Sequence, residues 1–254
     1  MTTLILDEKE YVDKILSEGA LHPSRIYLFL GLYARYLYHE KELRKTKIIK
    51  ALDAFMEENY PRYNPVDWGL NLEKYAGKAS RYPLCQCRGI WLTKEELDTI
   101  SGIHDKVLER LAFTLLCLAK FNNFRNPLNN NWVNSSNGEI YSMACINTTA
   151  AEKDLKLGRL REMGLIEHAR KIDNLSVQVL FTVPEGTQKL FVSDFRKLGY
   201  EWRLYQGENY IRCAGCGILV KNTNGRRRFC KECGEQANKE KSRERMKKIR
   251  AEEK

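Results

Sequence analysis

The sequence predicts a mainly α-helical protein with a small amount of β structure, the α+β class, and three observations lead to this prediction. Apolar residues in the first ninety positions recur at the three-to-four spacing of buried helix faces. The middle of the chain mixes capped helix starts with short β-prone runs, and two close cysteine pairs precede a charged C-terminal segment. We therefore expect five segments: a helical N-terminal domain (1–90), an α+β domain (91–190), a connector (191–211), a cysteine-rich module (212–236) and a basic helical tail (237–254).

The N-terminal domain is expected to be a bundle of amphipathic helices. Pro23 suits the first turn of a helix whose apolar positions run through 26–37, and a second apolar series covers 48–56. Between residues 60 and 89 prolines and glycines interrupt the spacing, so loops are expected there. The tyrosine-rich first helix is expected to form core or a homodimer interface rather than a base-stacking platform.

Two further cysteines, Cys85 and Cys87, lie in the segment expected to form loops. A second metal site there would need additional ligands, such as His104 or Cys117, brought close by the fold. Without such partners, these two cysteines are expected to be plain thiols.

In the middle domain the helix starts are marked by capping boxes, in which a threonine is followed three residues later by glutamate. Thr93 with Glu96, and Thr149 with Glu152, have this spacing. A long apolar helix (105–121), a short strand (132–133) and a short helix (138–144) are expected between the two boxes. The helix that starts at the second box should end at Gly164, which suits the left-handed position after a helix. Two strands (166–170 and 176–183), joined by a turn at residues 173–174, are expected to follow.

This order of elements resembles the winged helix-turn-helix domain over residues 93–183. The resemblance implies that the helix over 149–163 enters the major groove of duplex DNA, while the β-hairpin wing contacts the flanking backbone. The residues it assigns to DNA contact are Lys153, Lys156, Arg159 and Arg161 on the helix, and Arg170 and Lys171 in the wing. Winged helices also serve as protein-binding modules, and an ordinary solvated helix face carries lysines too, so a protein partner stays open.

The cysteine-rich module contains two C-x2-C pairs, Cys213 with Cys216 and Cys230 with Cys233. Four thiolates at this spacing are typical of a tetrahedral Zn²⁺ site, and the spacing disfavours free thiols or disulfides. The segment has no histidine, and four cysteines leave no open coordination position, so the expected role is structural rather than catalytic. The dipeptide at 224–225, Asn-Gly, predicts a β-hairpin between the two pairs.

Positive charge is concentrated in and after this module. From residue 213 to the end there are thirteen Lys and Arg against six Asp and Glu, a net +7 of the chain's +10. The residues expected to contact phosphates are Arg226, Arg227 and Arg228 in the loop, and Arg243, Lys247 and Arg250 on one face of the tail helix. Such cations gain affinity for nucleic acid by releasing counterions. The alternative is a solvated helix whose charge only aids solubility.

The module also resembles a treble-clef finger, because a C-A-G-C-G knuckle at 213–217 precedes F-C-x2-C at 229–233. Treble clefs include His-Asn-His nucleases, but the absence of histidine here argues against that chemistry. Together with the basic tail and the run at 194–200, the module is similar to small regulatory or accessory proteins of Firmicutes phages and integrative elements. No nucleotide-binding or hydrolase motif occurs in the chain, so an enzyme is not expected.

The sequence therefore predicts a DNA-binding protein, either a transcriptional regulator or a replication-associated factor of a phage or mobile element. An RNA-binding protein with the same basic surface, and a zinc-finger adaptor between proteins, are the alternatives. The N-terminus lacks the apolar run of a signal peptide and no stretch is long enough to span a bilayer. With cysteines that suit a metal rather than disulfides, this predicts a cytoplasmic protein without a membrane partner.

Overall fold

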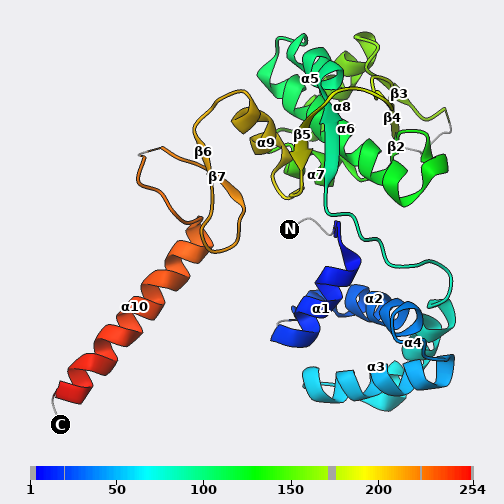
Figure 1. Ribbon diagram of the computed structural model, residues 1–254, viewed down its shortest axis with the longest axis vertical. Helices are drawn as coiled ribbons and strands as arrows, with labels where there is room; N and C mark the ends of the chain where they lie inside the picture. The colour runs from blue at the N-terminus through cyan, green and yellow to red at the C-terminus, as the bar shows by residue number, and fades with distance from the viewer. Residues whose placement is uncertain (1–3, 20, 171–175, 224, 253–254) are drawn as a thin grey trace. The chain divides into compact units, whose positions relative to one another are not determined.

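The computed structural model describes residues 4–19, 21–170, 176–223 and 225–252, and it divides into two compact units. The smaller unit covers residues 4–88, and the larger unit covers the chain from residue 89 onward (Figure 1). Helices dominate both units and the strands form small sheets, so the predicted α+β class is confirmed.

In the smaller unit the described residues form a helical bundle. Its elements are α1 (Glu8–Glu18), the 3-10 turn η1 (Pro23–Arg25), α2 (Ile26–His39), α3 (Lys45–Asn59) and α4 (Pro65–Lys78). The central helix is α2, which packs against α1, α3 and α4 and buries Phe29, Leu30 and Ala34 completely. Phe29 and Tyr36 thus contribute to a core, and the ring of Phe29 lies 4.8 Å from that of Phe55 on α3. Tyr27 and Tyr38, by contrast, are 55% and 41% exposed, so the prediction of a core role does not hold for these two tyrosines.

Helix α4 contradicts the prediction of loops between residues 60 and 89. Pro65 begins this helix instead of breaking it, because the first helical position needs no backbone N–H. The side chain of Asn64 caps the helix by accepting a hydrogen bond from the Val66 N–H (3.1 Å). At Gly69 and Gly77 an added Cβ would meet no atom within 4 Å. Both glycines therefore lie away from the packed side of α4 and do not interrupt its packing.

The end of the smaller unit is fastened by a buried carboxylate. Glu8 accepts hydrogen bonds from the Arg35 guanidinium (2.7 Å) and from the backbone N–H of Cys85 (2.7 Å). Arg35 also donates to the Tyr82 carbonyl (3.1 Å). The segment after α4 is therefore held against α1 and α2, and Cys87 within it is buried.

The described part of the larger unit contains both helices and strands. The helices are α5 (Lys94–Ser101), α6 (Lys106–Arg125), η2 (Pro127–Asn129), α7 (Asn137–Met143), α8 (Ala150–Glu162), α9 (Leu198–Tyr205) and α10 (Lys231–Glu252). The strands are β1 (Ile90–Thr93), β2 (Trp132–Val133), β3 (Ile166–His168), β4 (Val177–Val179), β5 (Gln188–Val192), β6 (Tyr210–Arg212) and β7 (Leu219–Lys221). The antiparallel sheets are β1-β5, β2-β4-β3 and β6-β7.

The helix boundaries of this unit follow the sequence signals closely. Both predicted capping boxes are present, and a third joins Ser136 and Glu139 at the start of α7. Gly164 has φ of +72°, the left-handed conformation expected after α8. The predicted strand at 132–133 also forms. The wing strands are shorter than predicted, at 166–168 and 177–179, and the turn at 173–174 lies outside the described residues.

A completely buried carboxylate connects the elements around α6. Glu96 accepts hydrogen bonds from the Thr93 N–H (2.8 Å), the Lys120 ammonium (2.8 Å) and the Val183 N–H (2.9 Å). A buried charge is tolerated only when it is paired and hydrogen-bonded, and these donors satisfy that condition. They join the start of α5, the C-terminal half of α6 and the segment after β4.

Helix α9 lies in the segment expected to be a connector (191–211), and it is part of the core. Trp202 is 1% exposed, its ring lies 5.4 Å from that of Phe113 on α6, and its indole N–H donates to Glu109 (3.0 Å). At Gly199 an added Cβ would lie 1.9 Å from the Ala144 carbonyl oxygen, so glycine allows a close approach to the end of α7. With only eight residues, about two turns, α9 gives little periodic signal in the sequence.

Candidate metal centre and nucleic-acid interface

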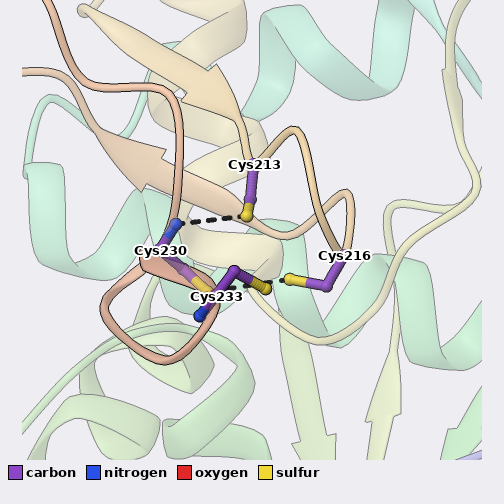
Figure 2. A group of neighbouring side chains, drawn as sticks. All are labelled: Cys213, Cys216, Cys230 and Cys233. Carbon is purple, nitrogen blue, oxygen red and sulfur yellow. Dashed lines mark hydrogen bonds between the residues drawn. The ribbon is translucent and has the colours of Figure 1, made fainter. Parts of the chain in front are cut away.

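The four cysteines of the C-terminal module come together at one point. The Sγ atoms of Cys213, Cys216, Cys230 and Cys233 all lie within 4.8 Å of one another (Figure 2). The Cys216 and Cys230 sulfurs are 3.8 Å apart, and a tetrahedron with metal–sulfur bonds of about 2.3 Å has sulfurs about 3.8 Å apart. The cluster can therefore hold a metal ion in a closed four-thiolate site.

Strands β6 and β7 carry the first pair of cysteines in the turn between them. Within that turn the Gly217 N–H donates to the Cys213 carbonyl (2.8 Å), and Gly217 has φ of +73°. The β-hairpin therefore carries the first cysteine pair in its turn, whereas the sequence predicted a hairpin between the two cysteine pairs. No strand forms in the described part of residues 222–230. The Asn-Gly signal was misleading because the polar and basic residues on either side lack the alternating apolar pattern of paired strands.

The second pair is positioned by the start of α10. Cys230 directly precedes this helix and Cys233 lies in its first turn. The Cys230 N–H points at the Cys213 sulfur (3.1 Å), and the Cys233 N–H points at the Cys230 sulfur (3.4 Å). At Gly215 an added Cβ would lie only 3.0 Å from the Cys233 sulfur, so glycine lets the two segments meet. Backbone N–H donors directed at sulfur favour the thiolate form that metals bind.

The thiols influence one another's charge. Burial raises the pKa of Cys213, but hydrogen bonds from the backbone of Cys230, Cys216 and Gly215 outweigh it and lower that pKa to about 6. The pKa of Cys233 is raised to about 12 by hydrogen bonding with the Cys230 and Cys216 thiols. Four thiolates at this distance repel one another, and a divalent cation is the partner that would hold all four in the charged form.

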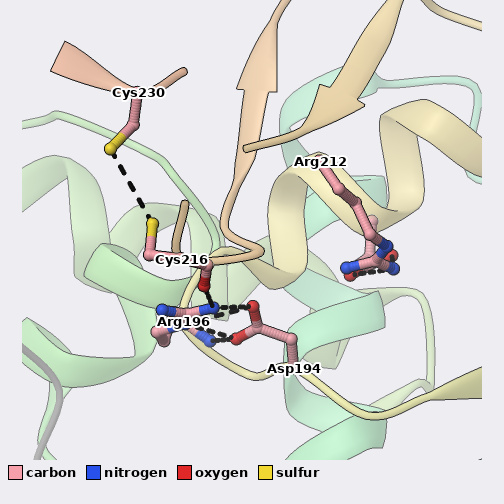
Figure 3. Close-up of polar contacts among 6 residues, drawn as sticks. Asp194, Arg196, Arg212, Cys216 and Cys230 are labelled. Atoms are coloured by element: carbon pink, nitrogen blue, oxygen red, sulfur yellow. Dashed lines mark hydrogen bonds and ion pairs between the residues drawn. The ribbon is translucent and has the colours of Figure 1, made fainter. Parts of the chain in front are cut away.

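Two arginines fasten the module to the rest of its unit. Arg196 pairs with Asp194 (2.7 Å) and donates to the Cys216 carbonyl (2.8 Å), as Figure 3 shows. Arg212, on β6, donates to both carboxylate oxygens of Glu201 on α9 (2.9 and 3.1 Å). No sequence pattern points to these two arginines, because the spacing of opposite charges along the chain does not reveal which of them will pair in the fold.

The four basic residues predicted on α8 differ in their surroundings. The Lys153 ammonium lies over the ring of Tyr141 (5.6 Å), on the side where α8 packs against α7. Lys156 donates to the Thr148 hydroxyl (3.3 Å), while Arg159 and Arg161 are exposed. The predicted contact set is therefore divided between two lysines with partners inside the protein and two outward arginines.

The remaining predicted contact residues lie after β3, in the loop between β7 and α10, and on α10. Arg170 is exposed and lines a hollow of about 580 Å³ beside the β2-β4-β3 sheet. Arg227 donates to the carbonyls of Phe229 (3.1 Å) and Lys221 (3.2 Å), so it braces the loop. Four further basic residues, in the loop and on α10, are also exposed: Arg226, Arg228, Arg243 and Lys247. Lys171 and the side chain of Arg250 lie outside what the structure describes.

Among the described residues, the four-cysteine cluster is the only group of three or more potential metal ligands, and it does not include Cys85 or Cys87. None of the helices in the described part of the chain has the length and apolar character that a bilayer span requires. No protein-family model, curated protein or solved structure matches the chain.

Proposed function

We propose that the protein binds duplex DNA through two surfaces of its larger unit. The order α6, β2, α7, α8, β3, β4 supports the interpretation of this region as a winged helix, with α8 as the helix that enters the major groove. The cysteine-rich module (212–236), which we call the finger, and α10 would contact phosphates, which fix position without reading sequence. We propose a role as a regulator or replication-associated factor of a phage or mobile element, in the cytoplasm and without an enzymatic activity.

The observation that carries this proposal is the contrast in charge between the two surfaces. Residues 213–254 carry a net +7, and every described side chain from residue 238 to residue 247 on α10 is exposed. Helix α8 carries four basic residues against three acidic ones, so it is nearly neutral. This difference fits a division in which the finger and tail provide non-specific attraction and α8 provides discrimination.

Zinc is the metal we propose for the finger. Four thiolates in a closed tetrahedral arrangement suit Zn²⁺, and the ion would supply folding energy to a module too small to bury a core of its own. The proposed role is structural: Zn²⁺ would hold β6, β7 and the start of α10 together, so that the basic loop and tail keep a fixed relation to α9.

The proposal is tested by selection from a random duplex pool with the zinc-loaded protein, followed by affinity measurements over a series of salt concentrations. Replacing Arg243 and Lys247 together by alanine should weaken binding to all sequences and lower the salt slope by about two, since each phosphate contact contributes about 0.9. A matched control replaces Lys47 and Lys50, two exposed lysines of α3 in the smaller unit, and should leave the slope unchanged.

Other outcomes would favour the alternative functions. Equal or tighter salt-dependent binding to structured RNA would replace DNA by RNA as the ligand, because a helix cannot read the deep, narrow major groove of A-form RNA. If neither nucleic acid binds even at low salt, the nucleic-acid proposal fails and a zinc-finger adaptor between proteins, or a homodimer interface, takes its place.

A further inference from the structure

One side of α8 is buried, and the opposite side displays a stripe of two apolar residues and one arginine. Leu157 and Leu160 face the core at 3% and 0% exposure. Leu155 is 66% exposed on the opposite side, with Arg159 one turn further on. Ala151, one turn before Leu155, is also exposed, so the outward stripe joins two apolar residues to one guanidinium.

Gly158 lies beside this stripe without a packing reason to be glycine. An added Cβ there would meet no atom within 4 Å, and the residue sits in the interior of α8, where glycine is disfavoured relative to alanine. A glycine with empty space above it leaves the helix backbone bare next to Leu155. Another molecule could therefore approach α8 more closely here than over any longer side chain.

The charges on α8 determine which part of DNA suits this stripe. The helix carries three acidic residues, Glu152, Asp154 and Glu162, all exposed. These carboxylates repel phosphates and nearly cancel the basic residues of the helix. A nearly neutral, partly apolar stripe gains little from the DNA backbone and more from the base edges.

Base edges in the major groove offer a partner for each member of the stripe. The thymine 5-methyl group is the apolar feature there and is contacted by apolar side chains, while arginine binds guanine O6 and N7 with two hydrogen bonds. Leu155 and Arg159 are separated by about 6 Å along the helix axis, and successive bases on one strand rise by about 3.4 Å. The two side chains thus match bases one or two steps apart.

We infer that α8 recognises a thymine methyl group through Leu155 and Ala151, with Gly158 allowing the close approach, and a neighbouring guanine through Arg159. This specificity rests on the proposed DNA-binding function. It gives the preferred site a chemical signature: a thymine whose methyl group matters, with a guanine one or two base steps away.

The test replaces each thymine of the selected site in turn by deoxyuridine, which keeps the base pairing and removes only the methyl group. For the unaltered, zinc-loaded protein, one or two positions should weaken binding about three- to fivefold, the loss expected for one buried methyl-sized group. With Leu155→Ala most of this penalty should disappear, because only the small Ala151 side chain would still face the methyl group. Arg159→Ala should remove the preference for the neighbouring guanine.

A matched control is Leu128→Ala, which removes a leucine that is 90% exposed and belongs to η2 rather than to α8. This variant should keep the full penalty for deoxyuridine. Because Leu155 is exposed, its alanine variant should stay folded, and circular dichroism checks this.

The outcomes separate this inference from the function on which it rests. If selection yields no motif, sequence-specific DNA binding itself fails. If a motif is selected but deoxyuridine is tolerated at every position, or if its penalty persists in Leu155→Ala, the methyl-reading role of Leu155 is overturned while DNA binding stands.

Discussion

Single residues in the finger depend on neighbours that are distant in the sequence. Cys213 gains its acidity from backbone N–H groups of both cysteine segments, and a contact as close as that of Gly215 with Cys233 leaves no room for a side chain. The chemistry of each thiol is thus determined by the closed cluster as a whole, and removing one member should affect all four.

The first prediction concerns that cluster. Cys213→Ser should reduce the zinc content from one ion per chain to none, because three thiolates and a hydroxyl bind Zn²⁺ far more weakly than four thiolates. Hydrogen exchange should become fast in β6, β7 and the start of α10, but stay slow in α5 to α8. Metal analysis and exchange mass spectrometry measure both effects.

Cys145→Ser provides the control, since Cys145 lies outside the cluster and should leave one zinc per chain. Full zinc content in Cys213→Ser would contradict the four-cysteine assignment.

A second residue-scale prediction concerns the pair between Arg212 and Glu201. Burial raises the pKa of Glu201, and Arg212 partly offsets this by lowering it. Arg212→Ala should therefore leave a buried, unpaired carboxylate at neutral pH and lower the free energy of unfolding by about 1–3 kcal/mol. Without Arg212 the pKa of Glu201 rises further above its unfolded value, so on acidification the folded state takes up the proton first. The deficit should shrink as the pH falls from neutral into the mildly acidic range.

Urea unfolding of the zinc-loaded protein, at neutral pH and again in mild acid, measures this loss of unfolding free energy. The double variant Arg212→Ala with Glu201→Gln should recover part of the stability at neutral pH. A deficit that is unchanged or larger in mild acid would show that the charge of Glu201 is not its cause.

At the scale of elements, prediction succeeded where a local signal decides the structure. The capping boxes at Thr93 and Thr149 and the glycine after α8 depend on a few adjacent residues, and the structure confirms them. Helix α4 was missed because Pro65 was interpreted as a break, although a proline in the first turn favours a helix. The hairpin of the finger was misplaced because the cysteine cluster, rather than an Asn-Gly turn, determines where its strands pair.

Two glycine-to-alanine substitutions, one on α9 and one on α8, should change the free energy of unfolding in opposite directions. Gly199→Ala would place a Cβ 1.9 Å from the Ala144 carbonyl oxygen. It should therefore displace α9 and lower the free energy of unfolding by about 1–3 kcal/mol, as overpacking does. Gly158→Ala should instead raise the free energy of unfolding by about 0.5–1 kcal/mol, because the added methyl group meets open space inside a helix. Denaturant unfolding compares the two variants, and equal effects would contradict this packing.

The whole molecule consists of two units, each with its own buried core. The sequence placed the division near residue 90, and the structure places it between residues 88 and 89. No sequence pattern indicates the contacts that join the finger to α9, because they pair residues from separate elements by charge and shape. The four metal ligands were recognisable at once, whereas the residues that support them were not.

The last prediction concerns the independence of the two units. Fragments 4–88 and 89–254, expressed separately, should each fold, because each retains the core contacts that its own residues make. Each should unfold cooperatively in denaturant, at a midpoint close to that of the same region in the full chain, and only fragment 89–254 should bind zinc. Failure of either fragment to fold would show that its core depends on the other.

The contacts of Arg196 and Arg212 also affect how this finger could be transplanted. A chimera that takes only the cysteine segment, from residue 210 onward, would separate Arg212 from Glu201 and the Cys216 carbonyl from Arg196. The grafted segment would then carry Arg212 without its carboxylate partner and the Cys216 carbonyl without its guanidinium donor. The smallest portable cassette therefore begins before Asp194 and includes α9, and protein engineers should graft the finger together with its helical base.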